Sequence, residues 1–226
     1  MKRVALVGLS MLLSSSLSFA QDAPAAKSAD TAPSTKLGAF LGKRGTLLVR
    51  DFYQVGILSQ KKDFNNADYK ASKFYTSYEQ MNKDRSGDFV IIDATVDVTA
   101  LAVYEPGNEK VKVKGLQIIL YKYNRSGSDK NLSFVDVEEA RSLSKALDYL
   151  VDAAAKSKGQ DVGSREVSFT TKDNLKVVLS QSGAKDAEVQ MSSGTIGRAT
   201  VSLASVDDLT QIKSAVDNGV AWLEKQ

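Results

Sequence analysis

LSFVDVEEARSLSKALDYLV, residues 132–151, and VSLASVDDLTQIKSAVDNGV, residues 201–220, align without a gap and decide the fold. The two stretches share five identical and six conservatively replaced positions at an offset of 69 residues. In both copies a short alternating strand leads directly into a capped amphipathic helix, which is typical of one supersecondary unit used twice. The sequence therefore predicts two tandem units, each of which ends in a helix.

The strands of the first unit are predicted upstream of residue 132. Residues 45–58 are rich in β-forming side chains, and residues 88–104 alternate between apolar and polar positions. The turn Glu105-Pro106-Gly107-Asn108 then predicts a hairpin. A four-residue loop would pair Val103 with Lys110, Leu101 with Lys112 and Thr99 with Lys114. That register predicts a polar face on which the lysines lie beside Asp93, Thr95, Asp97 and Thr99.

The second unit repeats the plan in a shorter form, with strands predicted at 165–171, 175–181, 188–192 and 198–204. We expect Asp136 to cap the first helix and Ser205, with Asp208 in the box position, to cap the second. The predicted fold class is α+β, with two tandem ββββα units whose antiparallel sheets are each covered by a C-terminal helix. The units span residues 37–158 and 159–226 and pack as one pseudo-twofold domain, because a single unit leaves a sheet face uncovered.

Residues 60–87 fit neither unit and are interpreted as an insertion. Ala71, Phe74, Tyr75, Tyr78 and Met81 match one helical face, but KFYTSY (residues 73–78) is equally compatible with a strand. The aromatic side chains predict either a binding patch or a short element packed on the open end of the sheet. The second interpretation is favoured, because apolar stripes at helical spacing usually pack in a core.

The N-terminus predicts export. Lys2 and Arg3 precede an apolar stretch, and Ser18-Phe19-Ala20 provides a signal-peptidase site, so residues 1–20 are interpreted as a signal peptide cleaved near Ala20. Residues 21–36 lack large apolar side chains and are interpreted as a flexible leader. The chain has no cysteine to carry a lipid, and the apolar stretch is too short for a permanent membrane anchor. We expect a soluble periplasmic or secreted protein.

Charge and residue usage restrict the chemistry. Without residues 1–20 the chain carries 28 basic and 27 acidic side chains, so its overall charge does not favour polyanions. With no histidine or cysteine, the common nucleophile triads, thiol chemistry and zinc sites are excluded. No phosphate-binding glycine motif or calcium loop occurs. Asp93 and Asp97, about 13 Å apart along one strand, are too distant for glycoside hydrolysis. The sequence predicts a protein that is not an enzyme and binds no cofactor.

Two tandem ββββα units resemble, in their element order, the Whirly single-stranded-DNA-binding proteins. The resemblance covers residues 45–225 and implies a shared fold, with no sequence motif of that family to transfer. Single strands require a positive surface with rings for stacking. The counterpart here is the run Lys110, Lys112, Lys114, Tyr121, Lys122, Tyr123 and Arg125. Asp93 and Asp97 on the same predicted face, and the export signal, make nucleic acid the less favoured partner.

The preferred hypothesis is an exported, non-catalytic module that binds an unknown protein or envelope component. The binding surface would be the sheet face or the insertion. The alternative is binding of single-stranded nucleic acid through a Whirly-like sheet. The candidate surface residues are Phe74, Tyr75, Tyr78, Lys110, Lys112, Lys114, Tyr121, Tyr123 and Arg125.

Overall fold

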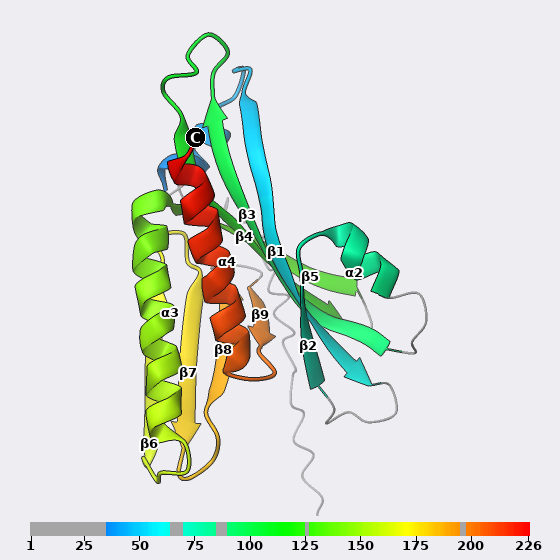
Figure 1. Ribbon diagram of the computed structural model, residues 1–226, viewed down its shortest axis with the longest axis vertical. Helices are drawn as coiled ribbons and strands as arrows, with labels where there is room; N and C mark the ends of the chain where they lie inside the picture. Colours follow the sequence, from blue (N-terminus) through cyan, green and yellow to red (C-terminus); the bar gives the residue numbers. More distant parts are fainter. Residues whose placement is uncertain (1–34, 64–69, 85–89, 125–126, 195–197) are drawn as a thin grey trace, which may run out of the picture. The chain divides into compact units, whose positions relative to one another are not determined.

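Two antiparallel sheets and two long helices make up the fold (Figure 1). The computed structural model describes residues 35–63, 70–84, 90–124, 127–194 and 198–226. The first sheet, in the order β2-β1-β3-β4-β5, consists of β1 (Val49–Asp63), β2 (Lys70–Tyr75), β3 (Val90–Tyr104), β4 (Val113–Asn124) and β5 (Gly127–Asp136). The second is a meander of β6 (Ser164–Thr170), β7 (Lys176–Ser182), β8 (Glu188–Ser193) and β9 (Ala199–Ser202). The helices are α1 (Lys36–Leu41), α2 (Tyr78–Asp84), α3 (Val137–Ser157) and α4 (Asp207–Glu224). The predicted α+β class with two antiparallel sheets is confirmed.

The repeated stretch corresponds to equivalent elements, since β5 runs into α3 and β9 is followed by α4. Buried side chains of α3 recur 69 positions later in α4, in the pairs Ala140 and Leu209, Leu143 and Ile212, Leu147 and Val216, and Ala154 and Leu223. At a further buried pair the side chains differ most in size, since Leu150 of α3 is matched by Gly219 of α4.

That glycine lies where α4 packs closely on the first sheet. A Cβ atom on Gly219 would lie 2.7 Å from Cδ2 of Leu116 and 3.3 Å from Cγ2 of Val55. α4 contacts β1, β3 and β4, whereas α3 contacts β4, β5 and β6, and the two helices pack side by side (Figure 1). The helix that ends the second unit therefore packs on the sheet of the first unit.

One main core joins both units. It combines buried side chains of β1, β3, β4, α3 and α4 with those of β7, β8 and β9, and all described residues belong to a single compact unit. The two sheets are also joined by polar contacts. The Ser133 and Ser193 hydroxyl oxygens lie 2.6 Å apart, and the Phe134 N–H donates to Asp173 at 2.7 Å. Separating the units would expose both apolar and polar buried groups.

The predicted helix caps are occupied in a different way. Asp136 stands at the N-cap of α3, but its carboxylate accepts from the backbone N–H groups of Lys36 and Leu37, both at 3.0 Å, and so holds α1. α4 begins at Asp207, so its N-cap residue is Val206 and the prediction that Ser205 caps it is wrong. The Asp208 carboxylate accepts from the N–H groups of Ala204 and Ser205. That contact is the backward half of the predicted capping box. Asp136 therefore serves tertiary structure and makes no side-chain capping bond to α3, whereas Asp208 binds the backbone that leads into α4.

The insertion contains both a strand and a helix. β1 continues to Asp63, β2 pairs along its outer edge, and α2 follows β2. The helical and strand interpretations of residues 60–87 therefore each apply to one part, with residues 64–69 and 85–89 outside the described ranges. At the N-terminus, the predicted signal peptide and residues 21–34 also lie outside them. Thr35 caps α1 and Lys36 begins it, so the predicted leader extends two residues too far.

Candidate functional site

The predicted aromatic patch of the insertion is divided between the two faces of the first sheet. We call the face that carries Asp97 and Thr99, opposite the main core, the outer face. Phe74 points away from it and packs on the main core, with its ring over Gly56. Tyr75 is buried on the outer face in a small cluster with Ile57 and Met81. Neighbouring strand residues point to opposite faces, so Phe74 and Tyr75 do not form one patch.

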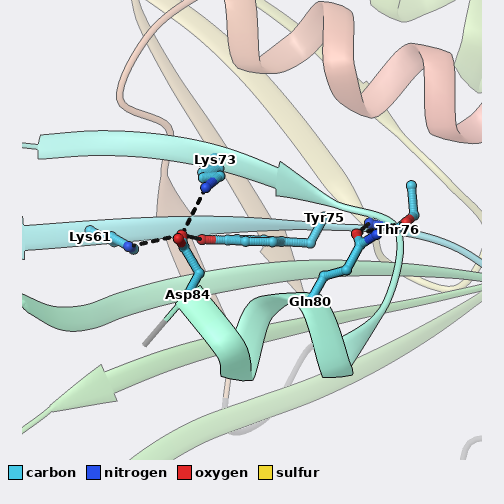
Figure 2. A network of polar contacts seen from close by, with 6 residues as sticks. All are labelled: Lys61, Lys73, Tyr75, Thr76, Gln80 and Asp84. Atoms are coloured by element: carbon cyan, nitrogen blue, oxygen red, sulfur yellow. Dashed lines mark hydrogen bonds and ion pairs between the residues drawn. The ribbon is translucent and has the colours of Figure 1, made fainter. Parts of the chain in front are cut away.

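A network of polar contacts fastens α2 to the sheet (Figure 2). Asp84, at the end of α2, accepts from the Tyr75 hydroxyl at 2.6 Å, from Lys73 at 2.9 Å and from Lys61 at 3.3 Å. The hydrogen bond from Tyr75, followed by those from Lys73 and Lys61, lowers the pKa of the Asp84 carboxyl well below its ordinary range. Tyr75 and its partners therefore hold α2 against the first sheet.

A second anchor of α2 lies beneath Tyr78. The carboxylate of Asp97, 3 % exposed, accepts from the Tyr78 hydroxyl at 2.5 Å, from Gln54 Nε2 at 2.6 Å and from Thr99 Oγ1 at 3.3 Å. Burial, followed by the hydrogen bond to Asp97 and the charge of that carboxylate, raises the pKa of the Tyr78 hydroxyl. Among the described residues Asp97 has no ion pair, so hydrogen bonds alone compensate its burial.

The predicted register of the β3–β4 hairpin is wrong. Val103 pairs with Val113 instead of Lys110, and Ala102 pairs with Lys114. The loop contains two successive turns, in which the Asn108 N–H donates to the Glu105 carbonyl and the Val111 N–H to the Asn108 carbonyl. This longer loop shifts the register by three residues. An odd shift exchanges the two faces of the strand. Lys112 and Lys114 therefore lie on the face of the sheet that does not carry Asp97 and Thr99.

The lysines consequently have other surroundings from those predicted. Lys110 is exposed in the loop, and Lys112 forms a 2.9 Å ion pair with Asp51 and lies 5.0 Å from the ring centroid of Tyr104. Asp93 forms an ion pair with Lys122. The predicted ladder of acids and lysines on one face is therefore absent from the described part of the first sheet.

Tyr121 and Tyr123 do lie together on the outer face. Their rings stack with centroids 6.2 Å apart and an interplanar angle of 12°. Lys130 of β5 places its Nζ 5.2 Å from the Tyr121 ring centroid, within the range of cation–π attraction. Arg125, the remaining predicted residue, lies outside the described ranges. The structure thus brings Tyr121 and Tyr123 together, packs Tyr123 against the cluster that contains Tyr75, and adds a lysine.

The end of the first sheet where β1 begins has features that the sequence interpretation missed. We call residues 42–54 and 104–114 the hairpin end. β2 pairs only with Ile57–Lys62 of β1. Within the described residues, the edge of β1 that faces away from β3 therefore has no neighbouring strand from Val49 to Gly56. Three large apolar side chains are exposed here, Phe52 at 70 %, Leu47 at 75 % and Val111 at 60 %. The signal for this edge is the difference in length between β1 and β2, which appears only once both strands are placed.

The hairpin end also carries uncompensated positive charge. Six cationic side chains stand here against three acids, of which Asp51 and Glu105 pair with Lys112 and Lys43, while Glu109 accepts from the Gly107 N–H and forms no ion pair among the described residues. Arg44, Arg50 and Lys110 have no ion pair within the described ranges. An adjoining hollow of about 430 Å³ is lined by Lys36, Lys112, Val113, Lys114, Asp136, Val137, Glu138, Arg141, Leu223 and Glu224.

Comparisons with known protein families, curated proteins and solved structures find no match. The resemblance to the Whirly proteins therefore rests on element order alone. No helix in the described ranges is both long and apolar enough to cross a bilayer. The same ranges contain no group of three or more acidic side chains arranged to hold a metal ion.

Proposed function

We propose that this chain is an exported, non-catalytic binding protein that recognises another protein of the cell envelope through the hairpin end. The observation that carries the proposal is the unpaired edge of β1 beside the exposed side chain of Phe52. Unpaired strand edges and clustered exposed apolar side chains are features that soluble proteins usually avoid unless a partner covers them.

The position of this surface suits binding. The β1 and β3 strands of the hairpin end are held by a long antiparallel pairing that extends to Val49 and Tyr104. On the core side, the Tyr53 ring stacks on Trp222 of α4 with centroids 6.0 Å apart. The backbone is therefore rigid where the apolar side chains are exposed, which reduces the entropy lost on binding.

Several observations favour binding over catalysis. The chain has no histidine or cysteine. The buried carboxylate of Asp97 already accepts three hydrogen bonds from neighbouring side chains. An acid held in this way stabilises the attachment of α2 instead of presenting a free oxygen to a substrate.

Export is the second part of the proposal and rests on the signal-peptide pattern of residues 1–20. N-terminal sequencing of the protein recovered from the periplasm or the medium tests it. We expect the chain to begin at or near Gln21, and recovery of the intact precursor from the cytoplasm would contradict export.

The binding surface is tested by site-specific photocrosslinking in cells. Benzoylphenylalanine is placed at position 52, and the matched control places it at position 149, because Tyr149 on α3 is also exposed, at 58 %. We expect a discrete adduct from position 52, weakened by Arg50→Glu, and none from position 149. Equal adducts at both positions, or none at 52, would contradict the proposed surface.

A second candidate function is binding of single-stranded nucleic acid, which the stacked Tyr121 and Tyr123 beside Lys130 favour. Filter binding of a thymidine oligonucleotide at several salt concentrations tests this candidate. Binding that weakens steeply with salt and is lost in the Tyr121→Ala, Tyr123→Ala double variant would support it. No retention at low salt would exclude it.

A further inference from the structure

The open edge of β1 offers unpaired backbone groups. In an antiparallel pair, alternate residues direct their N–H and C=O groups toward the neighbour and the others direct them outward. From Val49 to Gln54, β1 pairs regularly with β3 on one side, and in the described structure nothing pairs with its other side. A register shift between Gln54 and Gly56 interrupts the ladder. The edge available for regular pairing is therefore Val49 to Gln54.

The side chains along this edge are arranged by face. Arg50 and Phe52 pair with Val103 and Leu101, so both lie on the outer face. Asp51 and Tyr53 lie on the other face, where Lys112 and Trp222 already engage them. Only the outer face thus presents unengaged groups, a positive charge and an aromatic ring two residues apart.

Charge indicates what kind of strand fits. Arg50 on the edge has no ion pair in the described ranges. The hairpin end has three acids against six cationic side chains, and two of the acids, Asp51 and Glu105, are already paired. Glu109 forms no ion pair there, so the surface keeps an excess of positive charge. A second copy of this edge would bring like charges together, which disfavours self-association. An acidic strand would instead find complementary charge.

We propose that the partner contributes an extended segment that adds to Val49–Gln54 as a further strand of the first sheet. Backbone hydrogen bonds supply the affinity, and alternate side chains supply the specificity. On the outer face the segment carries an aspartate or glutamate beside Arg50 and an apolar residue beside Phe52. This inference rests on the proposed binding function and specifies its chemistry.

The absence of cysteine from the chain permits a direct test by tethering. Leu47, 75 % exposed and close to the edge, is replaced in the variant Leu47→Cys and joined by a disulfide to a synthetic peptide. The peptide has a Gly-Ser linker followed by Glu-Ser-Val-Ser-Glu-Ser-Val. A short tether gives effective concentrations of about 1 mM, so a weak interaction becomes measurable.

Two control peptides separate the contributions. One replaces each glutamate with lysine, which reverses the charge. The other replaces each intervening serine with proline, which keeps the charge but removes backbone donors needed for strand pairing. Far-ultraviolet circular dichroism of each conjugate verifies that the variant is folded.

The measurement is amide hydrogen exchange of residues 49–54 by NMR. We expect the glutamate peptide to slow exchange about tenfold at alternate amides, because new hydrogen bonds protect only outward-facing N–H groups. The lysine peptide should protect at least threefold less, about the loss expected from one missing charge contact. The proline peptide should also protect at least threefold less, because it lacks backbone donors for strand pairing. In the Arg50→Glu background the preference between the glutamate and lysine peptides should reverse.

Several results would overturn strand addition. Protection by the proline peptide equal to that by the glutamate peptide would show that pairing is not involved, and no protection by the glutamate peptide would show that the edge accepts no such strand. Protection of residues 49–54 by a free thymidine oligonucleotide, but not by the peptide, would assign the surface to nucleic acid. If a crosslinked adduct forms at position 52 together with any of these results, protein binding at the hairpin end is retained and strand addition is rejected. If no adduct forms but the glutamate peptide protects the edge, the edge can accept a strand and the proposed binding function is rejected.

Discussion

Replacing Tyr78 with phenylalanine removes a single hydroxyl group and tests how α2 is held on the outer face. The hydroxyl donates to the buried Asp97 carboxylate at 2.5 Å, so its loss leaves one oxygen of a buried charge without a side-chain donor. A hydrogen bond to a charged group contributes about 1.5–3 kcal/mol. The Tyr78 side chain is 41 % exposed, and water can partly replace the donor. We therefore expect a loss of about 1–1.5 kcal/mol in the free energy of unfolding.

Urea denaturation followed by circular dichroism measures this loss, and a matched thermal scan should show a melting temperature lower by about 2–5 °C. Tyr149→Phe is the control, because its exposed hydroxyl has no described partner, and it should change stability by less than about 0.5 kcal/mol. A double-mutant cycle with Asp97→Ala, which removes the acceptor, isolates the pair and should give a coupling of about 1 kcal/mol. A Tyr78→Phe variant as stable as the control, or zero coupling, would refute the assigned contact.

The same contact has a pH signature. Because folding raises the pKa of Tyr78 above its ordinary value of 10.0, the stabilisation is fully present below pH 10. It is lost as the pH rises above 10, where the unfolded chain releases the proton first. Between pH 9 and about pH 11, wild-type stability should therefore fall more steeply than that of Tyr78→Phe. Parallel pH profiles for the two proteins would contradict this reasoning.

Three further perturbations test other contacts. Gly115→Ala would place a Cβ atom 2.5 Å from the Val135 carbonyl oxygen, and it should lower the free energy of unfolding by about 2–3 kcal/mol in urea titrations; an unchanged midpoint would contradict that close approach. Asp208→Ala leaves the Ser72 hydroxyl and two backbone N–H groups without their acceptor, which should cost about 2–4 kcal/mol, with Asp208→Asn intermediate. The depressed pKa of Asp84 means that its stabilisation is present above the ordinary value of 3.8 and is lost only as the pH falls through the lowered value. Its carboxyl ¹³C shift should accordingly stay constant on acidification through pH 3.8, and a transition there would argue against the network of Figure 2.

The local elements could be predicted from the sequence because their signals are periodic. The alternation of residues 88–104 identified β3, and the apolar stripes identified α3 and α4 with their buried positions. The sequence also placed Asp136 and Asp208 at the starts of these helices, but neither N-cap residue makes a side-chain capping hydrogen bond. What the pattern could not show is that Asp136 also binds α1, because that contact joins residues 100 positions apart in the sequence.

The wrong predictions lie where an odd or even number of loop residues decides which face a side chain occupies. The Pro-Gly turn predicts a loop of four residues, but a second turn at Asn108–Val111 shifts the register by three residues and places the lysines on the other face. The aromatic residues of the insertion were treated as one set, although a strand alternates its side chains between faces. The open edge of β1 depends on where β2 ends, a property of two strands together that no single stretch of sequence contains.

The placement of α4 on the first sheet has a consequence for biosynthesis. The apolar face of β1, β3 and β4 is synthesised early, but part of its cover is α4, residues 207–224, so that face cannot be fully buried until residue 224 has left the ribosome. The two units therefore cannot fold independently, one after the other, during synthesis. A chain interrupted before residue 207 would keep its first sheet incompletely folded, and proteases would recognise it as unfinished.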